Sequence, residues 1–121
     1  MKIAIPLADG RLCLHFGHCG HFALVDADPA EKKIVAREDV EAPPHQPGLL
    51  PAWLAERGAT VVIAGGMGGR AQQLFAARGI EVIVGAPAET PEKLVTDYLA
   101  GNLPDDEAIG AGIYQFDAAQ L

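Results

Sequence analysis

Short apolar runs alternate with turn residues through the first third of the chain, and this pattern predicts β-strands. The segments Lys2–Leu7, His21–Asp26 and Ile34–Val40 are each long enough for one strand. Asp9-Gly10 follows the first run as a turn signal, and the polar segment 28–33 can join the other two as a hairpin. We therefore expect the three runs to form the antiparallel part of a sheet.

Beyond the proline-rich loop at 41–51, helical segments alternate with buried-strand segments. Two runs rich in β-branched residues, Thr60–Ala64 and Ile80–Val84, predict strands that continue the sheet in parallel. Helices are predicted between Pro51 and Gly58, over Arg70–Arg78, and between Thr90 and Gly101. This order predicts an α/β fold with a five-stranded mixed sheet and three helices on its faces.

The length and charge of the chain limit its domain organisation and the classes of partner that it can bind. The 121 residues suffice for one domain, which we assign to 1–104, and residues 105–121 are expected to form an acidic, partly mobile tail. Nine Lys and Arg face sixteen Asp and Glu, a net charge of −7 that argues against nucleic-acid and anionic membrane partners. The sequence shows neither a signal-peptide pattern nor an apolar stretch of membrane-spanning length, so a cytoplasmic location is expected.

The segment from Arg11 to His21 holds the residues best suited to chemistry. It contains both cysteines and three of the four histidines. Thiolates and imidazoles together favour zinc, iron or copper over magnesium or calcium. The glycines of the segment allow tight turns, so several of these side chains can converge. The candidate metal ligands are Cys13, His15, His18, Cys19 and His21.

Other roles for these residues stay open at this point. A cysteine also serves as a small buried hydrophobe or as half of a disulfide, and a histidine can hydrogen-bond a loop carbonyl. The spacing matches neither a zinc finger nor a Rieske centre. His45, in the proline-rich loop, is a sixth candidate ligand, although loop histidines commonly face solvent.

A second glycine-rich segment, Gly65–Gly69, lies between a predicted strand and a predicted helix. The first N–H groups of a helix attract anions, so this segment can hold a sulfide-rich cluster or a molybdate-like oxyanion. Its candidate contacts are Gly66, Gly68 and Arg70. The alternative is that the glycines only permit close packing between strand and helix. A loose dinucleotide fingerprint is also present, but the acidic residue that would hold a ribose is missing after the next strand.

The two motifs occur in the order typical of a known family. His15-Phe16-Gly17 followed by an aromatic residue at Phe22, and then the glycine-rich segment before Arg70-Ala71, resembles the dinitrogenase iron–molybdenum cofactor biosynthesis domain of the NifX-like and NifB C-terminal type. The similarity continues to Tyr98–Leu103 and so covers residues 1–104. The resemblance implies a ribonuclease H-like fold.

The resemblance also implies a function. Members bind, carry or assemble iron–sulfur or iron–molybdenum-type clusters without catalysing a reaction, in nitrogen fixation and outside it. It marks His15 as a cofactor contact and favours His45, whose His-x-Pro-Gly-Leu-Leu-Pro stretch resembles the same subgroup. The absence of serine from the chain removes the Gly-x-Ser-x-Gly nucleophile elbow, which agrees with a non-enzymatic role.

We therefore expect a monomer or weak homodimer that delivers a cluster to an apo-protein or exchanges it with a cluster-assembly ATPase. The alternative is a structural-zinc module that regulates a partner and transfers no cluster.

Overall fold

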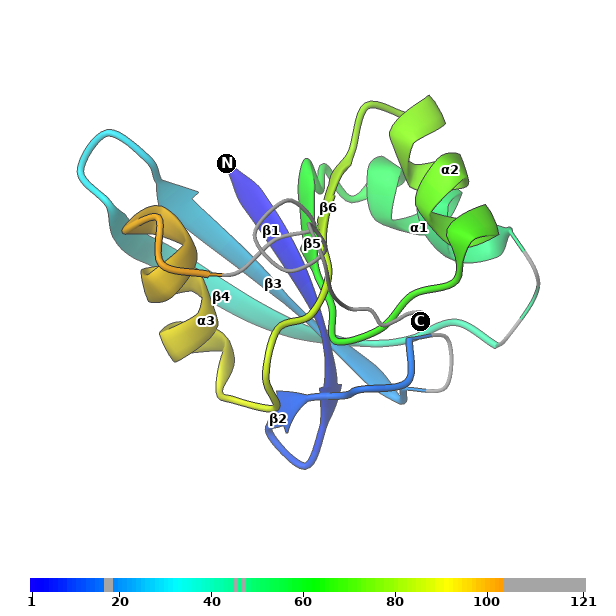
Figure 1. Cartoon of the computed structure of the whole chain (residues 1–121), viewed down its shortest axis with the longest axis horizontal. Helices are drawn as coiled ribbons and strands as arrows, with labels where there is room; N and C mark the ends of the chain where they lie inside the picture. The colour runs from blue at the N-terminus through cyan, green and yellow to red at the C-terminus, as the bar shows by residue number, and fades with distance from the viewer. Residues whose placement is uncertain (17–18, 45, 47, 104–121) are drawn as a thin grey trace.

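The computed structural model describes residues 1–16, 19–44, 46 and 48–103 (Figure 1). The tail expected at 105–121 and the candidate ligands His18 and His45 lie outside the described residues.

The strands of the described chain form one mixed sheet at the centre of the molecule. They are β1 (Lys2–Ala8), β2 (Arg11–Leu12), β3 (His21–Asp28), β4 (Lys33–Glu41), β5 (Val61–Ile63) and β6 (Glu81–Ile83). The order across the sheet is β4-β3-β1-β5-β6, and β2 pairs with β1 off this path. The β1–β3 and β3–β4 pairs are antiparallel, whereas β1–β5 and β5–β6 are parallel.

This arrangement confirms the expected division into an antiparallel and a parallel part, but the strand count of five was wrong. The sixth strand is β2, which pairs with the end of β1 through Leu7–Leu12 and Ala8–Arg11. The turn between them places Asp9 and Gly10 at φ of 55° and 79°, the left-handed conformation that two-residue hairpins require. A two-residue strand is too short to show a hydrophobic period, so the sequence pattern could not indicate it.

Three helices in the described ranges cover the two faces of the sheet. They are α1 (Leu49–Glu56), α2 (Gly69–Ala77) and α3 (Pro91–Leu99). The expected start of α3 is confirmed, because Thr90 Oγ1 accepts a hydrogen bond from the Lys93 N–H at 3.4 Å and proline occupies the first turn. None of the described helices is long and apolar enough to cross a membrane.

Figure 1 shows α3 on one side of the sheet and α1 with α2 on the other. Under α3, Leu94 and Val95 pack with the β1 side chains Ile3 and Ile5 in one core cluster. The second cluster, beneath α1 and α2, includes the aromatic rings of Phe22 and Phe75. Because both faces of β1 and β5 are buried, these strands read as unbroken apolar runs in the sequence.

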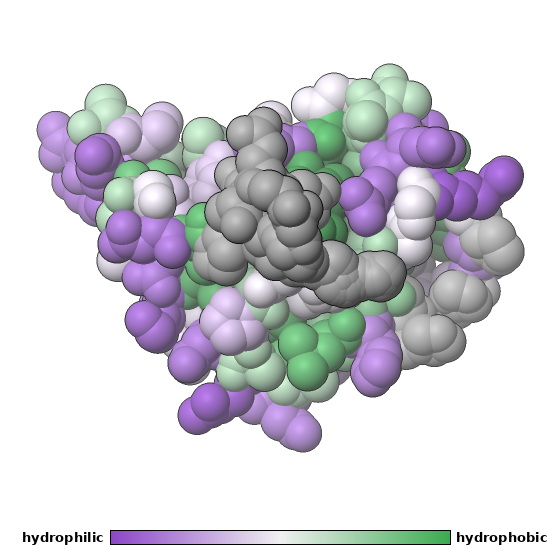
Figure 2. All heavy atoms as spheres, in the orientation of Figure 1, coloured by the Kyte–Doolittle hydropathy of each residue, from purple (hydrophilic) through white to green (hydrophobic). Residues whose placement is uncertain are grey.

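On the face shown in Figure 2, hydrophilic side chains dominate the periphery and hydrophobic ones gather toward the middle. Few large hydrophobic side chains in the described residues are well exposed, and one of them is Leu14, at 50%. Leu14 lies between β2 and β3, in the segment that carries the candidate ligands.

Candidate cofactor-binding site

The β2–β3 loop, residues 13–20, is anchored where it leaves the sheet and again within its length. The Cys13 N–H donates a hydrogen bond to the Pro6 carbonyl at 2.8 Å. The Phe16 ring packs edge-on against Phe22 and Phe75, with centroids 5.9 and 5.7 Å apart. The aromatic residue of the His-Phe-Gly motif therefore packs into the core, and this packing fixes the position of the histidine before it.

The β2–β3 loop lies against the glycine-rich turn, residues 65–69. His15 and Gly66 pair as an isolated parallel bridge, which joins the two motifs directly. A Cβ on Gly65 would lie 2.7 Å from Leu14 Cδ2, 3.2 Å from Leu12 Cδ2 and 3.3 Å from Leu14 Cα, so the Leu14 side chain and its backbone would have to shift to make room for it. Glycine at position 65 thus allows this close approach without such a shift.

Sheet topology explains why segments so far apart in sequence meet. Because β1 and β5 are adjacent parallel strands, the chain leaves both at the same edge of the sheet. Binding crevices of open α/β sheets lie at this edge, where loops follow the carboxyl ends of the strands. The glycine-rich turn and the His-Phe-Gly motif therefore lie side by side at this edge.

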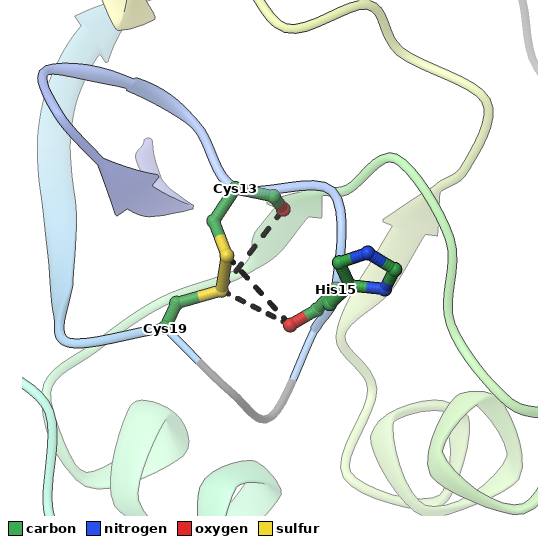
Figure 3. Close-up of a disulfide and its surroundings, with 3 residues drawn as sticks. All are labelled: Cys13, His15 and Cys19. Carbon is green, nitrogen blue, oxygen red and sulfur yellow. Dashed lines mark hydrogen bonds between the residues drawn. A yellow bond between two sulfur atoms is a disulfide. The ribbon is translucent and has the colours of Figure 1, made fainter.

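The two cysteines are joined in a disulfide, with their Cα atoms 6.0 Å apart (Figure 3). The His15 carbonyl oxygen lies 3.1 Å from Cys19 Sγ and 3.7 Å from Cys13 Sγ. Figure 3 shows that this carbonyl points toward the sulfur atoms while the His15 ring extends away from them. The main-chain carbonyl of His15 thus contacts the disulfide. The His15 side chain is exposed and can contact other groups.

The remaining candidate ligands are spread out. His21 begins β3, where it is exposed and lies opposite Leu7 on one side and Glu41 on the other. Within the part of the chain that the structure describes, three or more His, Cys, Asp or Glu side chains nowhere converge in a geometry that would hold a metal ion. A contribution from His18 or His45 falls outside that part and stays a prediction.

The glycine-rich turn presents backbone donors at the start of α2. Gly68 is the N-cap residue, and its position carries no side-chain cap. The Gln72 side chain instead donates a hydrogen bond from Nε2 to the Met67 carbonyl at 2.9 Å, which steadies the turn. Gly66, Gly68 and Arg70 are all exposed. Free N–H groups and a guanidinium at one helix end suit an anionic ligand.

Residues that hold the site together were missed by reasoning from the sequence. The sequence does not distinguish Gly65 from the other glycines of its segment, although a Cβ at position 65 would make the tightest contacts with the β2–β3 loop. Leu14 is not indicated by the sequence, because a single leucine between a cysteine and a histidine belongs to no recognisable pattern. Its signal would have been a large apolar side chain in a loop of otherwise polar and small residues.

Comparison with known proteins places these features in context. Residues 1–101 match the protein family described as dinitrogenase iron-molybdenum cofactor. Protein MJ0580 of Methanocaldococcus jannaschii is 33% identical over 85 residues, which are 68% of this chain and 72% of that protein.

Two solved structures share the fold at similar levels of identity. The crystal structure of PH0822 has a TM-score of 0.79 and 30% identity, and the alignment covers 88% of this chain and 95% of that one. The apo form of the orange protein from Desulfovibrio gigas has a TM-score of 0.68 and 29% identity, covering 86% and 91%.

Proposed function

This chain belongs to the dinitrogenase iron–molybdenum cofactor family, and we propose on that premise that it binds and carries a metal–sulfur cluster of the iron–sulfur or iron–molybdenum type. The cluster is cargo, held between the β2–β3 loop and the glycine-rich turn and passed to another protein.

The observation that carries this proposal is the His15–Gly66 bridge. It brings together a loop with soft sulfur and imidazole donors and a turn with backbone N–H donors. A sulfide-bridged cluster needs both kinds of contact, because its metal ions take soft ligands while its outer sulfides accept hydrogen bonds. Neither segment alone offers the two.

The donor set of the described residues fits such a group. When reduced, Cys13 and Cys19 supply two thiolates, and the exposed ring of His15 supplies an imidazole. Gly68 and Arg70, at the start of α2, can face the negative charge of the cluster. Two thiolates cannot ligate an all-cysteine cluster, so additional ligands come from the cargo itself, from histidine or from a second chain.

The comparisons support a carrier over a catalyst. The description of the family names a cofactor and no reaction, and the orange protein was solved in an apo form. We propose that the recipient is an apo-protein or a cluster-assembly ATPase. We also assign the fold to the ribonuclease H-like class, since β3 alone runs against the other strands of the β4-β3-β1-β5-β6 path.

The test is the metal content of the full chain purified without oxygen. We expect bound iron or molybdenum together with sulfide, and visible absorption from sulfur-to-metal charge transfer. His15→Ala and Cys19→Ala should each lower the bound metal while leaving the far-ultraviolet circular dichroism unchanged, because the sheet core does not depend on these side chains.

Asp9→Ala, in the β1–β2 turn, is the matched control and should keep the wild-type metal content. The proposal fails if the protein is colourless, takes up neither tetrathiomolybdate nor ferrous iron with sulfide, and behaves identically in the variants.

A further inference from the structure

The Cys13–Cys19 disulfide spans the β2–β3 loop, and small thiols in solution can reach it. Both side chains are only half-buried. Their Cα atoms, 6.0 Å apart, lie within the range that a disulfide accepts without movement of the backbone. Accessible disulfides exchange with small thiols far more readily than buried ones.

The structure also offers a partner for the reduced state. In the disulfide, the sulfur atoms have no hydrogen to donate, and the 3.1 Å approach of Cys19 Sγ to the His15 carbonyl is a close contact only. After reduction, the Cys19 thiol can donate a hydrogen bond to that same oxygen. Both redox states are therefore compatible with nearly the same backbone.

Contacts that do not depend on the disulfide hold the ends of the loop. Cys13 is tied to β1 through the Pro6 carbonyl, and the Ala42 N–H donates to the Gly20 carbonyl at 2.9 Å. Between these ties, the disulfide closes a short ring that contains His15, the residue paired with Gly66. Reduction thus releases one constraint on the His15 segment without unfolding the sheet.

We propose that Cys13 and Cys19 form a reversible thiol–disulfide switch that controls the cluster site. Oxidised, the pair constrains the His15 segment and withholds its sulfur ligands; reduced, it releases this one constraint and supplies thiolates, the form of cysteine that binds metals. The control of cargo rests on the proposed carrier function, whereas the switch itself does not.

The chemistry needs a low-molecular-weight disulfide as oxidant. One cysteine thiolate attacks the small disulfide, forming a mixed disulfide and expelling one small thiol. The second cysteine thiolate then attacks the mixed disulfide, forming the Cys13–Cys19 bond and expelling the other small thiol. Two electrons pass from the protein to the small disulfide, and reduced small thiol reverses both steps.

The switch is tested by equilibrating the full chain, under exclusion of oxygen, with mixtures of reduced and oxidised glutathione. Alkylation of free thiols followed by mass measurement gives the oxidised fraction. We expect one two-electron transition from dithiol to disulfide as the proportion of oxidised glutathione rises. A pair that stays unoxidised in excess oxidised glutathione overturns the proposal.

Hydrogen exchange then tests whether the switch acts on the loop. In the reduced protein, the amides of residues 14–16 and of Gly66 should exchange at least about tenfold faster than in the oxidised protein, with β1 and the Cys13 amide, which is hydrogen-bonded to the Pro6 carbonyl, unchanged. Cys13→Ser should show the fast pattern under both conditions. Identical exchange in the two redox states of the wild type contradicts a role of the disulfide in ordering the loop.

Tetrathiomolybdate, a soluble anion that combines molybdenum with sulfide, tests the control of cargo. Binding at least about tenfold tighter to the reduced protein, with the difference absent in Cys13→Ser, supports it. Equal binding to both states overturns the control and leaves the carrier function standing. Binding to neither state contradicts the carrier function, and the switch is then decided by the alkylation and exchange results.

Discussion

Single side chains determine whether the two halves of the proposed site can meet. Phe16 places His15 by packing against Phe22 and Phe75, so a motif that looks like a ligand motif is partly a packing motif. Gly65 acts in the opposite way, by the absence of a side chain. The role of each residue depends on a neighbour distant in sequence.

A matched pair of glycine substitutions tests this at the residue scale. Gly65→Ala should lower the free energy of unfolding by about 1–3 kcal/mol, because the new methyl group overpacks against Leu14. Gly68→Ala should cost less, about 0.5–1 kcal/mol for the less favourable N-cap residue, because nothing lies within 4 Å of its Cβ position and its φ of −64° suits alanine.

Urea unfolding of the three proteins measures both effects. Comparable losses in the two variants would mean that Gly65 is not specially constrained, and that the loop and the turn do not approach each other as described.

At the scale of elements, α3 is tied to the sheet by polar contacts that lie away from the proposed site. The Arg37 guanidinium, on β4, forms ion pairs with Asp39 and with Glu92 of α3. The hydrogen bond from Arg37 lowers the pKa of the Glu92 carboxyl from its ordinary value of 4.5. On the same helix, burial and a hydrogen bond donated to Glu81 raise the pKa of the Tyr98 phenol to about 12.

The Glu92 ion pair predicts an acid-dependent contribution to stability. A carboxyl with a lowered folded pKa stabilises the fold above the unfolded pKa, near 4.5, and this contribution disappears as the pH falls through the folded value. Near neutral pH, Glu92→Gln should therefore lower the free energy of unfolding by about 0.2–1 kcal/mol, as expected for an exposed pair. At strongly acidic pH the variant and the wild type should unfold alike.

Urea titrations from neutral to acidic pH measure this difference. Glu38→Gln is the control, because Glu38 neighbours Arg37 on β4 and points to the opposite face of the strand. A Glu92→Gln deficit that persists unchanged into acid would show that charge pairing is not its cause.

Much of the fold was predictable from the sequence, because the long elements have clear periods and caps. The three antiparallel strands, the two parallel ones and the Thr90 cap of α3 all appear where their patterns indicated. The features that the sequence did not predict are short or depend on tertiary contacts. β2 has two residues, and α1 begins at Leu49, before the proline that was expected to open it.

The site was predictable only in its outline. Clustered cysteines and histidines marked the β2–β3 loop, and the glycines marked the turn. Their juxtaposition through His15 and Gly66 follows from the pairing of β1 with β5, a contact between distant segments that no local pattern contains. The cysteine pairing was one of the open alternatives, and the spacing alone could not choose it.

On the scale of the whole molecule, the sheet holds in place the loops at one edge, where the chain leaves the carboxyl ends of β1 and β5. The buried strands β1 and β5 fix the positions of the two proposed binding segments, one of which follows the β1–β2 hairpin and the other β5, and α3 and the α1–α2 pair stabilise those strands from either side. The proposed binding site is thereby confined to short loops, which can adapt to a cargo without disturbing the core. This division agrees with a carrier, whose site must both accept and release its ligand.

The central claim, that the β2–β3 loop and the glycine-rich turn form one binding site, is tested most directly by backbone amide chemical shifts. Tetrathiomolybdate is added to the reduced full chain without oxygen, and the amide resonances are followed by nuclear magnetic resonance. We predict saturable shifts concentrated in residues 13–19 and 65–70, with α3 and β4 unaffected. Shifts centred on α3 or β4, or confined to only one of the two segments, would contradict a joint site.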